Sequence, residues 1–130
     1  MDNTVLIIDD DADTRDMITV GLLAEGWKVK AAHSLYGGLY ILAEDSSISC
    51  VLLDYNLPGM PMEDFLKQVH GVAPKVNLIL VTAADRVAEK ARTFGFKWYL
   101  AKPFDFAHLR AALKDACPEH FEPHEATRSF

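Results

Sequence analysis

The stretch Cys50-Val51-Leu52-Leu53-Asp54 is a short apolar run that ends on a carboxylate. Three other apolar runs of similar length also end on side chains suited to a metal ion or a phosphate. They are residues 5–8 before Asp9 and Asp10, residues 78–81 before Thr82, and residues 98–101 before Lys102. Short apolar runs that alternate with helical patterns indicate a parallel sheet, in which ligands bind at the carboxyl ends of the strands. We therefore expect these polar side chains to meet at one edge of a sheet.

Composition is typical of a globular, single-domain protein. The chain has 130 residues, of which 50% are hydrophobic and 25% are charged, and its formal net charge is -6. This length suffices for one core of ordinary size, and the hydrophobic content is too high for a disordered chain. The acidic balance disfavours direct nucleic-acid binding by the domain, because such binding neutralises phosphates with basic side chains.

The sequence shows no targeting or membrane signal. No apolar stretch approaches the roughly 18 residues of a membrane span, and residues 1–4 lack the basic flank of a signal peptide. Cys50 and Cys117 lie far apart without metal-ligand spacing, and we interpret them as reduced, partly buried thiols. These features predict a cytoplasmic protein that makes no membrane contact.

Hydrophobic periodicity and turn residues divide the chain into five strand-then-helix units. Strands are expected at residues 5–8, 27–32, 50–53, 76–82 and 97–101. Helices are expected at residues 12–25, 34–45, 61–70, 85–94 and 105–117. Five such units joined by short loops predict an α/β fold with one doubly wound parallel sheet.

Local signals refine these elements. The expected helix N-caps are Asp11 or Asp13, Ser34 and Asp105. Gly37 and Gly38 should make the second helix weak or irregular, because each glycine costs about 1 kcal/mol relative to alanine. Pro61 is expected in the first turn of the third helix. Residues 118–130 show no periodic pattern and are expected to form a mobile tail or a linker fragment.

Asp9, Asp10 and Asp54 would place three carboxylates within several ångströms of one another. Two unit charges 4 Å apart repel by about 4 kcal/mol at an effective dielectric constant of about 20, so such a cluster needs a cation. Mg²⁺ suits it because this hard ion prefers carboxylate oxygens, and Mn²⁺ is a possible substitute. A carboxylate can also attack phosphorus, forming an aspartyl phosphate that Lys102 and the Thr82 hydroxyl would stabilise.

Four motifs resemble the signature of response-regulator receiver domains and occur in the order and spacing of that family. They are Ile8-Asp9-Asp10, Leu53-Asp54-Tyr55-Asn56-Leu57-Pro58-Gly59-Met60, Val81-Thr82-Ala83 and Tyr99-Leu100-Ala101-Lys102-Pro103-Phe104. The resemblance extends from about residue 4 to residue 117. It implies a receiver domain at residues 1–117 with a flavodoxin-like (βα)5 three-layer fold and the strand order 2-1-3-4-5.

The resemblance also implies a role for each matching site residue. Asp54 corresponds to the phosphoacceptor, and Lys102 corresponds to the lysine that contacts the phosphoryl group. The implied metal ligands are Asp10, Asp54, the backbone carbonyl of Asn56, and Asp9 acting through water.

The same resemblance implies a conformational switch. Thr82 and Tyr99 correspond to the switch residues, and the bond between Lys102 and Pro103 is a candidate cis peptide. On phosphorylation, Thr82 would move toward the phosphoryl oxygens and Tyr99 would rotate from a solvated to a buried position. This movement would change the surface formed by the fourth helix, the fifth strand and the fifth helix.

The implied function is that of a phosphoacceptor module in two-component signalling. A histidine kinase or a histidine phosphotransfer protein would transfer a phosphoryl group to Asp54 in the presence of Mg²⁺, and hydrolysis would later remove it. Such a module is regulatory and is not an enzyme that turns over an external substrate. It acts either as a stand-alone relay or as part of a longer protein, and the sequence indicates no particular output partner or oligomeric state.

Two alternatives use the same residues. In the first, Asp9 is the nucleophile of a phosphatase, since Asp9 and Asp11 formally fit an Asp-x-Asp pattern, although the cap segment of such enzymes is not evident. In the second, the domain is a receiver-like scaffold that is not phosphorylated. Taken singly, the acids at residues 9–11 could simply cap a helix. Their combination with Asp54 and Lys102 favours the phosphoacceptor.

Two departures from the family pattern concern the surface. Pro61 and Met62 stand where an Asp-Gly pair is common after the third strand. Trp98 stands where receivers that dimerise through their last two helices commonly carry an acid. Trp98 is therefore interpreted either as an exposed anchor for a partner or as a side chain packed on the sheet.

Overall fold

The computed structural model describes residues 3–83, 85 and 87–121, and it contains one parallel sheet in the predicted order β2-β1-β3-β4-β5. The strands are β1 (Thr4–Ile8), β2 (Lys28–Ala32), β3 (Ile48–Asp54), β4 (Asn77–Thr82) and β5 (Trp98–Ala101). The helices are α1 (Ala12–Ala24), α2 (Leu35–Glu44), α3 (Met62–Val72), α4 (Val87–Phe94) and α5 (Phe106–Ala116), followed by the 3-10 helix η1 (Pro118–Phe121). Within this described part of the chain, no helix combines the length and the apolar character that a membrane crossing requires.

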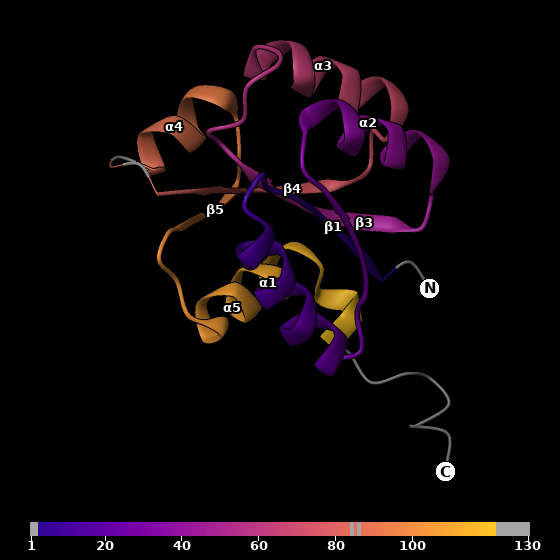
Figure 1. Cartoon of the computed structure of the whole chain (residues 1–130), viewed down its shortest axis with the longest axis vertical. Helices are drawn as coiled ribbons and strands as arrows, with labels where there is room; N and C mark the ends of the chain where they lie inside the picture. Colours follow the sequence, from indigo (N-terminus) through magenta and orange to yellow (C-terminus); the bar gives the residue numbers. More distant parts are fainter. Residues whose placement is uncertain (1–2, 84, 86, 122–130) are drawn as a thin grey trace.

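Helices cover both faces of the sheet and make a three-layer sandwich (Figure 1). Helices α2, α3 and α4 lie on one face, and α1 and α5 lie on the other. Side chains of β1 alternate between two cores: Leu6 and Ile8 join the core beneath α2 and α3, whereas Val5 and Ile7 join the core beneath α1 and α5. Because successive side chains of a strand point to opposite faces, a strand covered on both faces is apolar throughout, as β1 is.

The predicted capping residues determine where three helices begin. Asp11, Ser34 and Asp105 are the N-caps of α1, α2 and α5, and each side chain accepts a hydrogen bond from a backbone N–H of the first turn. Helix α1 ends just before Gly26, whose φ of 85° lies in the left-handed region that favours glycine. These caps start α1 and α5 within a few residues of the strand ends that precede them, so the intervening loops stay close to that edge of the sheet.

Helix α2 differs from the prediction, because it runs as a continuous helix from Leu35 to Glu44. The expected irregularity at Gly37 and Gly38 is therefore wrong. Gly38 is buried, and a Cβ built on it would collide with the Ile8 side chain. The glycine thus lets α2 approach β1 closely, and this packing outweighs the poor helix propensity of glycine.

Two helix starts also differ from the prediction. Pro61 is the N-cap of α3, with φ -63° and ψ 147°, so it precedes the first turn and does not belong to it. Helix α4 begins at Val87, later than the predicted start at Asp85. Both differences are small. They arise because helix ends depend on local backbone angles, which hydrophobic periodicity does not report.

Residues 118–121, which the sequence assigned to a mobile tail or a linker fragment, form η1 and pack on the domain. The His120 ring stacks on Trp27 with ring centroids 3.7 Å apart, and His120 Nε2 lies 2.9 Å from the carbonyl oxygen of Glu25. Arg110 of α5 also pairs with Glu25 at 2.8 Å. A single 3-10 turn is too short to show a periodic pattern, so the sequence did not reveal it. The remainder of the predicted tail, residues 122–130, lies outside the described residues.

We predict that Gly38→Ala destabilises the protein relative to a matched Gly71→Ala variant. Both glycines lie inside helices, so each substitution gains up to about 1 kcal/mol of helix propensity. A Cβ at Gly38 strikes the fully buried Ile8, and overpacking of this kind costs about 1–3 kcal/mol, whereas a Cβ at Gly71 meets nothing within 4 Å. Urea unfolding of both variants measures the difference. Equal free energies of unfolding would show that Ile8 moves aside without cost.

Candidate functional site

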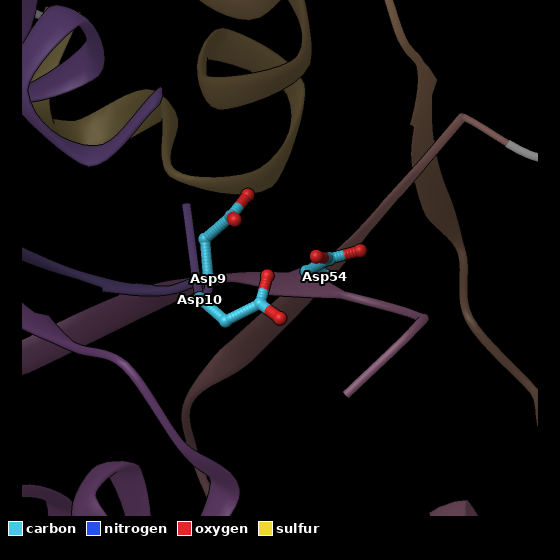
Figure 2. Close-up of side chains that lie close together, drawn as sticks. All are labelled: Asp9, Asp10 and Asp54. Carbon is cyan, nitrogen blue, oxygen red and sulfur yellow. The ribbon is translucent and has the colours of Figure 1, made fainter. Parts of the chain in front are cut away.

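Three carboxylates gather at the carboxyl ends of β1 and β3 (Figure 2). Asp9 and Asp10 follow β1, Asp54 ends β3, and one carboxylate oxygen of each residue lies within 4.8 Å of the others. The parallel register that pairs Ile8 with Leu53 brings the next residues of both strands side by side. Asp9 and Asp54 are buried, whereas Asp10 is exposed.

This donor set fits a hard divalent cation. Carboxylate oxygens are the ligands that Mg²⁺ prefers, and the ion usually keeps several waters, for which the exposed Asp10 side of the cluster is open. Asn56 lies next to the cluster, because its backbone N–H donates to Asp54 Oδ1 at 3.2 Å. The three expected carboxylate ligands therefore lie together, and the backbone of Asn56 contacts one of them, Asp54.

Lys102 reaches this cluster from the end of β5. Its Nζ atom lies 2.8 Å from Asp9 Oδ2 and 3.8 Å from Asp54 Oδ2, and its backbone N–H donates to the Thr82 carbonyl at 2.8 Å. Burial acts to lower the pKa of Lys102, but the hydrogen bond to Asp9 and the charges of Asp54, Asp9 and Asp11 together outweigh it, so the pKa is raised. The lysine is therefore a fixed positive charge beside the carboxylates. The bond between Lys102 and Pro103, a candidate cis peptide in the sequence, is cis.

The environment of Asp54 disfavours its negative charge. Burial raises the pKa of Asp54, and the nearby charges of Asp9 and Asp10 act in the same direction. The hydrogen bond from the Asn56 backbone and the positive charge of Lys102 oppose this effect without cancelling it. Asp54 is thus a carboxylate whose charge the surrounding protein compensates incompletely.

The three consecutive acids at the end of β1 have different partners. Asp11 caps α1, as the simplest interpretation of this acidic run predicted for at least one member. Asp9 instead accepts a hydrogen bond from the Asp11 backbone N–H at 2.9 Å, in addition to its contact with Lys102. Arg15 Nη1 donates to the Asp9 backbone carbonyl at 2.7 Å, a contact that the sequence did not indicate. The sequence signal for this contact is that Arg15 lies one turn into α1, near the residues that join β1 to this helix.

Thr82 and Tyr99 occupy neighbouring strands near the same edge. Thr82 ends β4 and is fully buried, and β4 lies between β3 and β5 in the sheet. Tyr99 lies on β5 and is 44% exposed. It borders a hollow of about 310 Å³ whose wall is shared by the start of α4, by β5 and by the start of α5; the lining residues are Val87, Tyr99, Leu100, Ala101, Pro103, Phe104 and His108.

The position of Trp98 lies between the two interpretations from sequence, an exposed anchor for a partner and a side chain packed on the sheet. It is partly buried and packs against the core beneath α1 and α5, and it borders a second hollow with Lys97 and Ala112. Packing on the domain therefore accounts for part of its surface, and no anchor role is assigned to it. Trp27, by contrast, is 2% exposed and belongs to the core.

Comparisons with known proteins agree with this geometry. The sequence-family model named response regulator receiver domain matches residues 5–114 of this chain. The transcriptional regulatory protein HprR of Escherichia coli is 31% identical over 118 residues, which cover 89% of this chain and 52% of that protein. The sporulation initiation phosphotransferase F of Bacillus subtilis is 28% identical over 120 residues, which cover 91% of this chain and 96% of that protein. The chain spans about half the length of several other curated relatives that it matches.

A solved structure shows the same fold. The response regulator receiver domain protein (CheY-like) from Methanospirillum hungatei superposes with a TM-score of 0.79 and 26% sequence identity, over 92% of this chain and 96% of that chain. The strand order and the layers of this chain match the fold of that structure, and the family model covers most of the described chain. This chain therefore belongs to the family of response regulator receiver domains, regulatory modules of two-component signalling.

Proposed function

We propose that Asp54 is the phosphoacceptor of a two-component phosphorelay. The observation that supports this proposal is the meeting of Asp54 with two further acids and the Lys102 ammonium at one edge of the sheet. Asp9 is less suited to attack phosphorus, because Lys102 and the Asp11 backbone N–H both hold its carboxylate. Asp54 Oδ2 lies farther from the Lys102 ammonium, at 3.8 Å, so this oxygen is less tightly engaged than the Asp9 carboxylate. The geometry therefore favours Asp54 over the alternative nucleophile Asp9.

Each residue of the site has a separate role in the proposed phosphoryl transfer. A carboxylate oxygen of Asp54 attacks phosphorus while the bond from phosphorus to the imidazole nitrogen of the donor breaks. The Lys102 ammonium then contacts a phosphoryl oxygen, and the Thr82 hydroxyl donates to another. Asp10, Asp54 and the Asn56 carbonyl would hold Mg²⁺, with Asp9 contributing through water, and the ion would supply the remaining charge neutralisation; Mn²⁺ would serve in its place. Attack of water on the same phosphorus later restores the carboxylate.

We further propose that phosphorylation changes the surface formed by α4, β5 and α5. A phosphoryl group adds acceptor oxygens next to β4, which draws Thr82 toward Asp54. This movement vacates space behind β5, where Tyr99 is 44% exposed and can turn inward. The hollow of about 310 Å³ beside Tyr99 would then change shape, and the partner would detect that change.

The partners follow from this chemistry. The donor is a histidine kinase or a histidine phosphotransfer protein, acting on the domain at residues 1–117. One relative, named a sporulation initiation phosphotransferase, is matched over almost its whole length, whereas a relative named a transcriptional regulatory protein is about twice as long. The chain therefore functions either as a relay by itself or as the receiver part of a longer regulator. Its net charge of -6 disfavours direct binding of nucleic acid by this domain, and we propose a cytoplasmic location for the module.

Incubation with Mg²⁺ and acetyl phosphate should add the mass of one phosphoryl group to the wild-type protein. Asp54→Ala should abolish this adduct, because it removes the nucleophile. Asp115→Asn, which removes one exposed acid of α5, should leave it unchanged. Intact-mass spectrometry with and without EDTA provides the measurement. An adduct that persists in Asp54→Ala would assign the nucleophile to another acid, and an adduct independent of Mg²⁺ would remove the metal from the proposal.

In EDTA and near neutral pH, Asp54→Asn should raise the free energy of unfolding. Burial raises the pKa of Asp54 in the folded state, so the fold disfavours the ionised carboxylate relative to the unfolded chain. The destabilisation is present above the folded-state pKa, and the gain from asparagine should shrink as the pH falls through that pKa. Asp115→Asn makes the same charge change at an exposed position and should give no comparable gain. Urea unfolding at several pH values tests this, and a wild type more stable than Asp54→Asn would contradict it.

Phosphorylation should move Tyr99 and leave Tyr40 unchanged. Tyr99 borders the hollow beside β5, whereas Tyr40 is 68% exposed on α2, outside the proposed switch surface. NMR spectra of ring-labelled tyrosines before and after addition of acetyl phosphate and Mg²⁺ compare the two residues within one sample. A fixed Tyr99 resonance in a protein whose phosphorylation is confirmed by mass would refute the switch without refuting the phosphoacceptor.

A further inference from the structure

A second cluster of reactive side chains lies at the end of the sheet opposite to the carboxylates. Cys50 lies near the start of β3, and Cys117 is the C-cap of α5. They are the two cysteines of the chain, both are free, and both are buried, with 0% and 4% exposure. Both are more deeply buried than the partial burial that the sequence predicted, and the sequence did not indicate that the two residues lie close together.

The fold brings the two thiols close together. Both residues belong to the core beneath α1 and α5, and Cys117 Sγ lies 3.8 Å from the carbonyl oxygen of Ser49, the residue that precedes Cys50. Asn77 Nδ2 donates to the Ala116 carbonyl at 2.7 Å and lies 3.9 Å from Cys117 Sγ. Two polar partners and a second thiol therefore surround Cys117 within an otherwise apolar core.

These contacts make the two thiols chemically unequal. The hydrogen bond from Cys50 is the largest influence on Cys117 and lowers its pKa to about 7, and the Asn77 donor acts in the same direction. The same pairing, together with complete burial, raises the pKa of Cys50. A thiolate is the reactive form of cysteine, and Cys117, with the Asn77 amide beside its sulfur, is the thiol of the pair that ionises more readily.

We propose that Cys50 and Cys117 form a dithiol modification site, which a small peroxide oxidises reversibly to an intramolecular disulfide. The Cys117 thiolate attacks one oxygen of hydrogen peroxide, so a sulfur–oxygen bond forms, the oxygen–oxygen bond breaks, and hydroxide leaves and takes up a proton to become water. Cys117 is then a sulfenic acid. The Cys50 sulfur attacks the Cys117 sulfur, a sulfur–sulfur bond replaces the sulfur–oxygen bond, and the Cys50 proton leaves with the hydroxyl group as a second water.

The position of the site gives the modification a structural consequence. Cys50 belongs to the strand that carries Asp54 at its other end, and Cys117 lies where the chain leaves α5 for η1. A bond between them joins β3 covalently to the end of α5. It would close a loop of the residues between positions 50 and 117, and such a cross-link restricts the unfolded chain more than the folded one.

Intact-mass spectrometry of the full chain treated with hydrogen peroxide tests this proposal. The expected product is a monomer that has lost two hydrogen atoms and both maleimide-reactive thiols together, and that recovers both thiols with dithiothreitol. The same product should be absent when the protein is treated in urea at a concentration that unfolds it, because only the fold brings the thiols together. Loss of one thiol without the other, oxygen addition that dithiothreitol does not reverse, or a disulfide-linked dimer would overturn the proposal.

Two variants identify which thiol reacts first. In Cys50→Ala, the Cys117 sulfenic acid has no partner and should accumulate as an adduct with dimedone. In Cys117→Ser, which keeps a polar group beside Asn77, Cys50 should react at least about tenfold more slowly with peroxide than Cys117 does in Cys50→Ala. Equal rates would overturn the assignment of Cys117 as the nucleophile.

The site is separable from the proposed phosphoacceptor. Asp54→Ala should form the disulfide as readily as the wild type, since Asp54 lies at the other end of β3. Failure of disulfide formation in both proteins would refute the dithiol site and leave the phosphorylation test untouched. Should either cysteine variant fold poorly, the mass and thiol measurements on the unmodified sequence still decide the question.

Discussion

The ammonium group of Lys102 contacts carboxylates on two other strand ends, and the charge balance of the functional edge depends on it. Lys102 and Asp9 lie 93 residues apart in sequence, yet Nζ is 2.8 Å from Asp9 Oδ2. The contact is possible because all strands run parallel and end at one edge, and because a lysine side chain is long enough to cross the end of β4. Thr82 ends that intervening strand. The sheet order therefore places the strand end that carries Thr82 between the strand ends that carry the lysine and Asp54.

One lysine does not neutralise three acids. The raised pKa of Asp54 shows that the folded protein holds a carboxylate in surroundings that disfavour its charge, and a core built for stability alone would avoid such a group. A raised pKa means that ionised Asp54 lowers the stability of the free domain, a cost that a bound divalent cation or protonation of Asp54 would relieve. A site of this kind responds strongly to ligands, because the same repulsion that destabilises the empty cluster favours cation binding.

Much of the fold and of the candidate site could be predicted from the sequence, because the signals involved are local. Capping by Ser34 and Asp105 depends on a few adjacent residues, and the convergence of Asp54 and Lys102 follows from parallel strands alone. Contacts between distant elements were not predictable in this way. The approach of Gly38 to Ile8, the hydrogen bond from Arg15 to Asp9, and the pairing of two thiols each depend on how faces of separate elements pack, which no periodicity reports.

The helix η1 shows how the end of α5 is oriented. Its His120 stacks on Trp27, which is buried in the core and lies at the junction of α1 and β2, and Arg110 anchors the same corner through Glu25. The backbone direction at Phe121 is therefore set by aromatic packing and not by a free hinge. The end of α5 is thus tied to the junction of α1 and β2, so a change in packing at either place would reach the other through the Trp27–His120 stack.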